Sequence, residues 1–113
     1  MSTNSPVETI TCRDLHALTV EGPIDLIDVR SPEEYSERRA EMARSFPLDH
    51  FDPHAVHAAR TTDPSQPIYF ICEVGVRSEW ACEVMRAAGY EYVVNVLGGT
   101  QAWEAAGLPI ASG

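Results

Sequence analysis

Short apolar runs alternate along the chain with segments in which apolar residues recur at helical spacing. The apolar runs have the length of buried strands and cover Val7–Ile10, Ile24–Arg30, Ile68–Ile71 and Tyr92–Leu97. The second of these runs is apolar enough to be covered on both faces, as in a parallel sheet. A further run, Ser45–Leu48, contains a proline and therefore predicts a short strand at the edge of the sheet.

Capping residues mark where the predicted helices begin. Thr11 and Ser31 suit the N-cap positions of the first two helices, and Ser31 is followed by Pro32 and Glu34, which complete a capping box. The segment 38–44 could continue the second helix or form a charged loop. Further helices are predicted from residue 52 to about 60, from about 76 to 89, and from about 100 to 106.

Strands and helices alternate throughout, and every connection suits a right-handed crossover. This order predicts an α/β domain, with a mostly parallel sheet of about five strands and helices on both faces. The chain has 113 residues, which is enough for one compact domain with a modest core.

The composition limits the partners and the compartment. The formal net charge is −9 and all eight basic residues are arginine, which disfavours nucleic acid and anionic membranes as partners. No apolar run is long enough to span a membrane, and residues 1–6 lack the basic and apolar stretches of a secretory leader. Three cysteines are too few and too scattered for a disulfide framework, so we expect a reducing compartment, the cytoplasm.

Cys72 is the candidate nucleophile, because it stands between a buried strand and a helix start. Ligands of open α/β sheets bind at the carboxyl ends of strands, where helix N-termini present N–H groups. Loop amides, the helix dipole and the Arg77 guanidinium would each favour the thiolate there. The alternative is a small core residue, the commonest role of a free cysteine, but such a residue needs neither Gly75 nor Arg77. Cys12 and Cys82 are predicted to be packing residues of this kind.

Three charged residues near the second strand are candidate supports of the cysteine loop. Asp28 and Arg30 emerge at the carboxyl end of that strand, and Glu34 lies in the first turn of the helix after it. We expect Arg30 and Glu34 to pair and brace the loop. The histidines within residues 50–57 complete no recognised ligand pattern, so we expect no metal and no cofactor.

A set of short motifs runs in order through nearly the whole chain. They are Leu26-Ile27-Asp28-Val29-Arg30 with Glu34-Tyr35, Cys72-x-x-Gly75-x-Arg77-Ser78, Gly89, Leu97-x-Gly99, Trp103 and Gly107-x-Pro109. In joint order and spacing they resemble the rhodanese family of sulfurtransferases. The resemblance covers about residues 9–110 and implies a single rhodanese domain over residues 1–113.

By this resemblance, Cys72 carries sulfane sulfur as a persulfide and Arg77 stabilises the anionic group. The rest of the loop would bind the substrate: Glu73, Val74, Gly75, Val76 and Ser78. The implied reaction takes sulfur from thiosulfate or a persulfide-bearing protein and passes it to a thiol or cyanide.

Two other functions are compatible with the same fold. A related phosphatase or arsenate reductase would place five residues between cysteine and arginine, whereas four stand here, and Ile71 replaces the histidine common before the cysteine. A non-catalytic interaction module usually loses the cysteine, which is retained here.

The chain departs from the family pattern in two places. Residues 38–43 replace a Gly-His-Ile-Pro-Gly-Ala turn and keep only Ala43, which predicts a different backbone path or a longer helix. Glu73 follows the cysteine, where enzymes acting on thiosulfate tend to carry basic or neutral residues. Its carboxylate either lies at the loop mouth and opposes free thiosulfate or points to solvent, and Arg38 or Arg39 could neutralise it.

Overall fold

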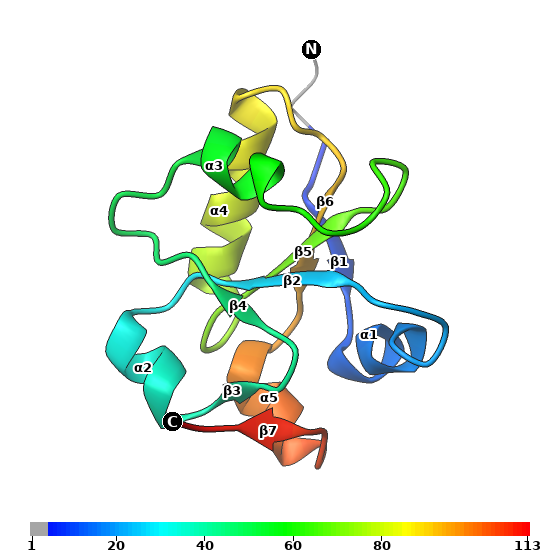
Figure 1. Cartoon of the computed structure of the whole chain (residues 1–113), viewed down its shortest axis with the longest axis vertical. Helices are drawn as coiled ribbons and strands as arrows, with labels where there is room; N and C mark the ends of the chain where they lie inside the picture. The colour runs from blue at the N-terminus through cyan, green and yellow to red at the C-terminus, as the bar shows by residue number, and fades with distance from the viewer. Residues whose placement is uncertain (1–4) are drawn as a thin grey trace.

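The computed structural model describes residues 5–113, and residues 1–4, part of the segment inspected for a leader, lie outside this range. Its main sheet has five strands in the order β1-β6-β5-β2-β4, and every neighbouring pair is parallel (Figure 1). The predicted α/β class and parallel sheet are confirmed. The strands are β1 Glu8–Ile10, β2 Asp25–Asp28, β4 Arg44–Ser45, β5 Ile68–Ile71 and β6 Val93–Val96.

The helices begin where the capping residues predict. Thr11 Oγ1 accepts the Asp14 amide at 3.1 Å, and Ser31 and Glu34 form both hydrogen bonds of a capping box. These bonds satisfy amide groups that the first helical turn leaves without partners. The helices are α1 Cys12–Leu18, α2 Pro32–Glu37, α3 Pro53–Ala58, α4 Val76–Ala87 and α5 Gly99–Ala105.

Helices cover both faces of the sheet (Figure 1). On one face, Leu15 of α1 and Trp103 of α5 pack on Ile71, and on the other face Met85 of α4 packs on Phe70. Successive β5 side chains enter opposite cores because strand side chains alternate. Burial on both faces confirms the expectation for a parallel sheet, and it fixes β5 so that Cys72 follows at its carboxyl end.

The edge strand and the segment before it differ from the prediction. β4 is Arg44–Ser45 and not Ser45–Leu48, because Pro47 has no N–H for the ladder, although Phe46 N still bonds Asp28 O at 3.0 Å. Helix α2 ends at Glu37, so continuation of the helix through 38–44 is wrong.

A small second sheet occupies the segment left open as a charged loop. β3 (Arg39–Ala40) pairs antiparallel with β7 (Ile110–Ala111), near the end of the chain. The Glu41 amide and the Trp103 indole N–H both bond the Pro109 carbonyl, at 3.0 and 2.7 Å. The C-terminal segment therefore holds this region in an extended path. Within residues 5–113, no helix is both long and apolar enough to cross a bilayer.

Candidate active site

Cys72 is buried at the carboxyl end of β5, with 1% of its surface exposed. The chain then turns at Gly75, whose φ of 105° is readily adopted only by glycine, and α4 begins at the next residue. This turn brings the Gly75 amide to 3.1 Å from Cys72 Sγ. The sulfur therefore has one backbone donor already in place.

The loop carbonyls are held by the first turn of α5. The Thr100 amide donates to Cys72 O at 2.8 Å, and the Gln101 amide donates to Glu73 O at 3.1 Å. Since N–H and C=O point in opposite directions across a trans peptide, the amides that follow these carbonyls point away from α5. Among residues 5–113 no acceptor serves the backbone amides of Glu73, Val74, Val76, Arg77 and Ser78. Such a set of free donors is suited to binding an anion.

Gly99 allows the two loops to approach closely. Its φ is 61°, and a Cβ there would clash with the carbonyl oxygens of Cys72 and Glu73. The Leu97-x-Gly99 motif therefore positions the cysteine loop, a role that the sequence pattern alone did not indicate.

A buried polar pair lies behind the sulfur. Ser78 Oγ is 3.3 Å from Cys72 Sγ and 2.5 Å from Asn95 Oδ1, while Asn95 Nδ2 donates to Gly75 O at 3.1 Å. Ser78 was among the predicted site residues, but Asn95 was missed. The available signal was one polar residue inside the otherwise apolar strand β6.

Arg77 lies in the first turn of α4 and pairs with Glu34 of α2. Its two terminal nitrogens donate to the two carboxylate oxygens at 2.9 and 3.0 Å. These hydrogen bonds are the main reason that the pKa of Glu34 falls to about 2 and that the pKa of Arg77 rises. The expected pairing of Arg30 with Glu34 is wrong, because Glu34 faces α4 and Arg30 turns back along its own strand.

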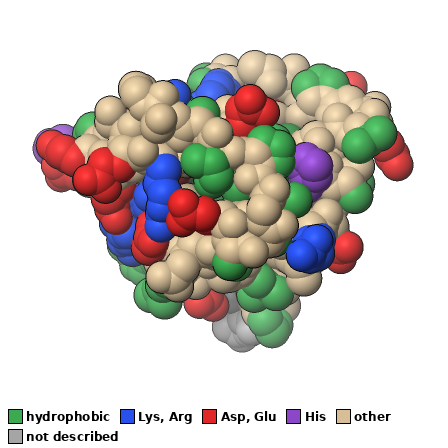
Figure 2. All heavy atoms as spheres, turned by 90° about the horizontal axis from the view of Figure 1, so that it is seen from below, with side chains coloured by type: hydrophobic (Ala, Val, Ile, Leu, Met, Phe, Trp, Pro, Cys, Tyr) green, Lys and Arg blue, Asp and Glu red, His purple; other side chains and the backbone are tan. Residues whose placement is uncertain are grey.

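Arg30 is the centre of a second ionic cluster. Its guanidinium is 2% exposed and donates to Asp28 Oδ2 at 2.9 Å, to Arg38 O at 2.6 Å and to Glu73 Oε1 at 3.2 Å. Arg38 bonds the other Glu73 oxygen at 2.8 Å and Glu104 at 3.1 Å. Glu73 therefore neither points freely to solvent nor stands unpaired at the mouth. Arginine and carboxylate side chains lie next to one another on the face seen in Figure 2.

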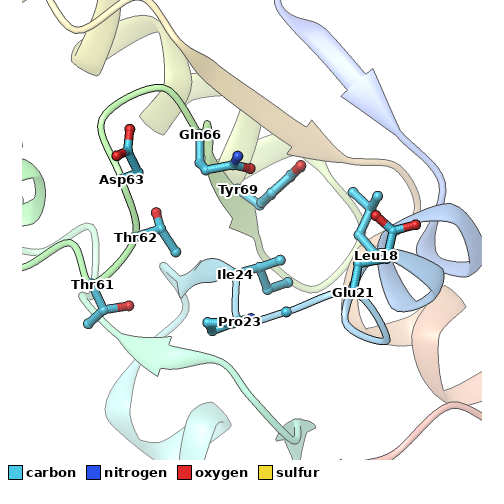
Figure 3. A pocket seen from close by; sticks show the side chains of 10 residues that line it. Leu18, Glu21, Pro23, Ile24, Thr61, Thr62, Asp63, Gln66 and Tyr69 are labelled. Atoms are coloured by element: carbon cyan, nitrogen blue, oxygen red, sulfur yellow. The ribbon is translucent and has the colours of Figure 1, made fainter.

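Two cavities differ in their relation to Cys72. One of about 490 Å³ lies beside Arg77, between the start of α2 and residues 47–49, where a substrate could approach. The other, of about 440 Å³, lies at the amino ends of β2 and β5, whereas Cys72 follows the carboxyl end of β5 (Figure 3). Figure 3 shows Ile24, Gln66 and Tyr69 lining this second cavity, and Tyr69 precedes the cysteine by three residues along β5. The cavity beside Arg77 is therefore the one of these two that lies on the Arg77 side of the sheet, although Cys72 does not line it.

The other cysteines lack this environment. Burial raises the pKa of Cys12 and raises that of Cys82 to about 12, so both remain thiols at neutral pH. They are free and lie in the core, which confirms their prediction as packing residues.

The histidines near α3 contact an aromatic ring. His54 Nδ1 is 2.6 Å from the Tyr90 hydroxyl, and His57 stacks on the same ring at 4.3 Å. Across residues 5–113, no group of three or more His, Cys, Asp or Glu side chains is placed to hold a metal ion.

The Arg77–Glu34 pair predicts acid-dependent stability. A carboxyl whose pKa is lowered by folding stabilises the fold above its unfolded pKa, near 4.5, and this contribution is lost as pH falls toward 2. We expect Glu34→Gln to lower stability at pH 7 by about 0.5–1 kcal/mol, since the pair is partly exposed. Thermal unfolding measured from pH 7 to 2 checks this. The difference from wild type should close below about pH 4.5, and a constant difference would contradict it. Glu33→Gln, in the same turn, is the control: Glu33 forms no ion pair within residues 5–113, so its loss should not reproduce this pH dependence.

A family model for the rhodanese-like domain matches residues 11–106. The chain belongs to the rhodanese-like family. A chloroplast protein of Arabidopsis thaliana, rhodanese-like/PpiC domain-containing protein 12, is 30% identical over 108 residues, which cover 91% of this chain and 36% of the relative. A sulfurtransferase of Allochromatium vinosum is 31% identical over 88 residues, covering 77% of this chain and 78% of the relative.

The fold agrees with solved rhodanese-like structures. The rhodanese-like domain of an Anabaena protein superposes with a TM-score of 0.79 at 24% identity, over 92% of this chain and 78% of that one. This rhodanese-like chain spans only 36%, 54% and 41% of the first three curated relatives that it matches, which are longer proteins.

Proposed function

We propose that this rhodanese-like chain is a sulfurtransferase that carries sulfane sulfur as a persulfide on Cys72. One observation supports this most strongly: the buried sulfur receives the Gly75 amide at 3.1 Å, inside a loop whose other amides have no acceptor in residues 5–113. A cysteine that only packs in the core needs no such donors. The similarity to proteins named sulfurtransferase agrees with this chemistry.

The reaction has two displacement steps. The Cys72 thiolate attacks the outer sulfur of the donor, the donor's S–S bond breaks, and its electron pair leaves with the donor remnant. The outer sulfur, now negative, lies among the free loop amides. An acceptor thiolate or cyanide then attacks that sulfur, and the Cys72 thiolate leaves. Both steps place negative charge where fixed donors stabilise it without reorganisation.

The ionic cluster bears on the choice of donor. Glu73 is bonded by Arg30 and Arg38, so its charge opposes an incoming anion less than an unpaired carboxylate would. We propose that both thiosulfate and protein persulfides can serve as donors, with a thiol or cyanide as acceptor. The three free cysteines suit a reducing compartment, and we propose the cytoplasm.

Thiocyanate formation from thiosulfate and cyanide tests the function directly. The purified chain should produce thiocyanate with saturable dependence on thiosulfate. A protein persulfide should be tested as donor in parallel, with loss of its outer sulfur followed by mass. Failure with both donors, in a folded protein, would contradict the proposal.

Arg77→Ala is expected to slow sulfur transfer about a hundredfold or more, because it removes a cation whose charge acts on Cys72, and losing electrostatic stabilisation of a developing negative charge can cost ~2.7–4 kcal/mol. Arg77→Lys should recover only part of the rate, because lysine lacks the planar fork. Steady-state kinetics check this. The matched control is Arg86→Ala near the other end of α4, where Arg86 bonds Ser5 O at 2.8 Å. Equal losses of sulfur-transfer rate in the Arg77 and Arg86 variants would contradict a role for Arg77 in the site.

A further inference from the structure

The buried amide of Asn95 touches both groups that contact the nucleophilic sulfur. Asn95 is 4% exposed, on a strand whose other residues are valines. Burying an amide is costly unless its donors and acceptor are used. Here Nδ2 donates to Gly75 O at 3.1 Å, and Oδ1 lies 2.5 Å from Ser78 Oγ. The Gly75 carbonyl can accept only from the NH₂ end, so it fixes the amide with Oδ1 toward Ser78.

The Ser78 hydroxyl has one proton and two acceptors within reach. Asn95 Oδ1 is at 2.5 Å and Cys72 Sγ is at 3.3 Å. When the proton goes to Asn95, the hydroxyl presents a lone pair to the sulfur and can accept from a thiol S–H. When the sulfur is a thiolate, the hydroxyl can turn its proton to the sulfur, and the Asn95 acceptor then loses its partner.

We propose that Asn95 is a positioning residue that competes with Cys72 for the Ser78 proton and so favours the states in which Sγ is uncharged. These states are the thiol and, if the proposed function holds, the persulfide, whose charge lies on the outer sulfur. In the persulfide, Sγ is bonded to two atoms and has little need of the hydroxyl proton. The proton then returns to Asn95, and the network is fully paired in the sulfur-loaded enzyme.

The competition predicts a specific effect of removing the amide. In Asn95→Val the Ser78 proton loses its rival acceptor and is available to the thiolate. Valine is close to asparagine in size and matches its neighbours on β6. We expect the pH midpoint of Cys72 alkylation to fall by about one unit, a tenfold gain in thiolate at a given pH. The charged groups around the site, Arg77, Glu34 and Asp28, are unchanged in this variant.

Alkylation by iodoacetamide is followed against pH, in a background carrying Cys12→Ser and Cys82→Ala so that one thiol reacts. Asn95→Val is compared with and without Ser78→Ala. The lowered midpoint should appear only when Ser78 is present. The same shift in both backgrounds or a raised midpoint would overturn the proposal, because either points to loop displacement through Gly75. No shift would also overturn it, because Asn95 would then not compete for the Ser78 proton. If Asn95→Val does not fold, Asn95→Leu serves the same comparison.

A second readout concerns the loaded state and depends on the proposed function. At a fixed ratio of thiosulfate to sulfite, and at a pH above the wild-type alkylation midpoint where free Cys72 is a thiolate, Asn95→Val should lower the ratio of persulfide to free Cys72 by about tenfold, the factor by which the thiolate is stabilised. An unchanged ratio with a lowered midpoint would overturn the link to loading. Absence of any persulfide in wild type would instead overturn the proposed function, while alkylation still tests the role of Asn95.

Discussion

Cys72→Ser is expected to abolish sulfur transfer and leave the fold intact. A serine hydroxyl is almost wholly protonated at neutral pH and cannot form a persulfide, so no part of the two-step route survives. The side chain is buried and contacts the Gly75 amide and Ser78, both of which can bond a hydroxyl oxygen as they do the sulfur. Thiocyanate formation and circular dichroism, measured on the same preparation, check both halves of the expectation.

The other two cysteines provide matched controls for this substitution. Cys12→Ser and Cys82→Ala should keep most of the activity, because both side chains are buried packing residues whose pKa is raised, so neither is a thiolate at neutral pH. A comparable loss of activity in Cys82→Ala, with the protein still folded, would contradict the assignment of Cys72 as the nucleophile.

Arg30→Ala is expected to lower the free energy of unfolding by about 3–5 kcal/mol, because it leaves an uncompensated charge in the interior. Asp28 is fully buried and receives bonds from the Arg30 guanidinium at 2.9 to 3.2 Å. The substitution also frees the Arg38 carbonyl and leaves Glu73 Oε1 with only the 3.4 Å hydrogen bond from Arg38, which loosens the cysteine loop. Urea unfolding, with the midpoint and slope compared, measures the change.

Arg13→Ala is the matched control for this stability prediction. Arg13 lies exposed on α1, so its loss should change stability by no more than about 0.5 kcal/mol. A loss below about 1 kcal/mol in Arg30→Ala would mean that Asp28 finds other partners, and the ionic cluster would then not be a determinant of loop stability.

Local signals predicted most of the fold, because they act within a few residues. The caps at Thr11 and Ser31 and the apolar runs of β5 and β6 needed only nearby sequence, and the structure places those elements within a few residues of the prediction. β3 could not be predicted in this way. It has two residues, and its partner β7 is near the far end of the chain, so its stability comes from a tertiary contact.

The candidate site was predictable to the extent that it follows from the strand–loop–helix order. That order places Cys72, Gly75 and Arg77 correctly, whereas the ion pairs depend on side-chain directions fixed by packing. Arg30 was expected to bind Glu34, but tertiary structure brings it to Glu73, which is 43 residues away. Asn95 was missed for the same reason, since its contact with Ser78 exists only after β6 pairs with β5.

Intact-protein mass spectrometry after incubation with thiosulfate tests the central claim most directly. The wild-type chain should gain the mass of one sulfur atom, peptide mapping should place it on Cys72, and cyanide should remove it. Cys72→Ser should gain nothing under the same conditions. If the added sulfur were found on Cys12 or Cys82, or if neither thiosulfate nor a protein persulfide loaded the folded wild-type chain, Cys72 would not be a sulfur carrier.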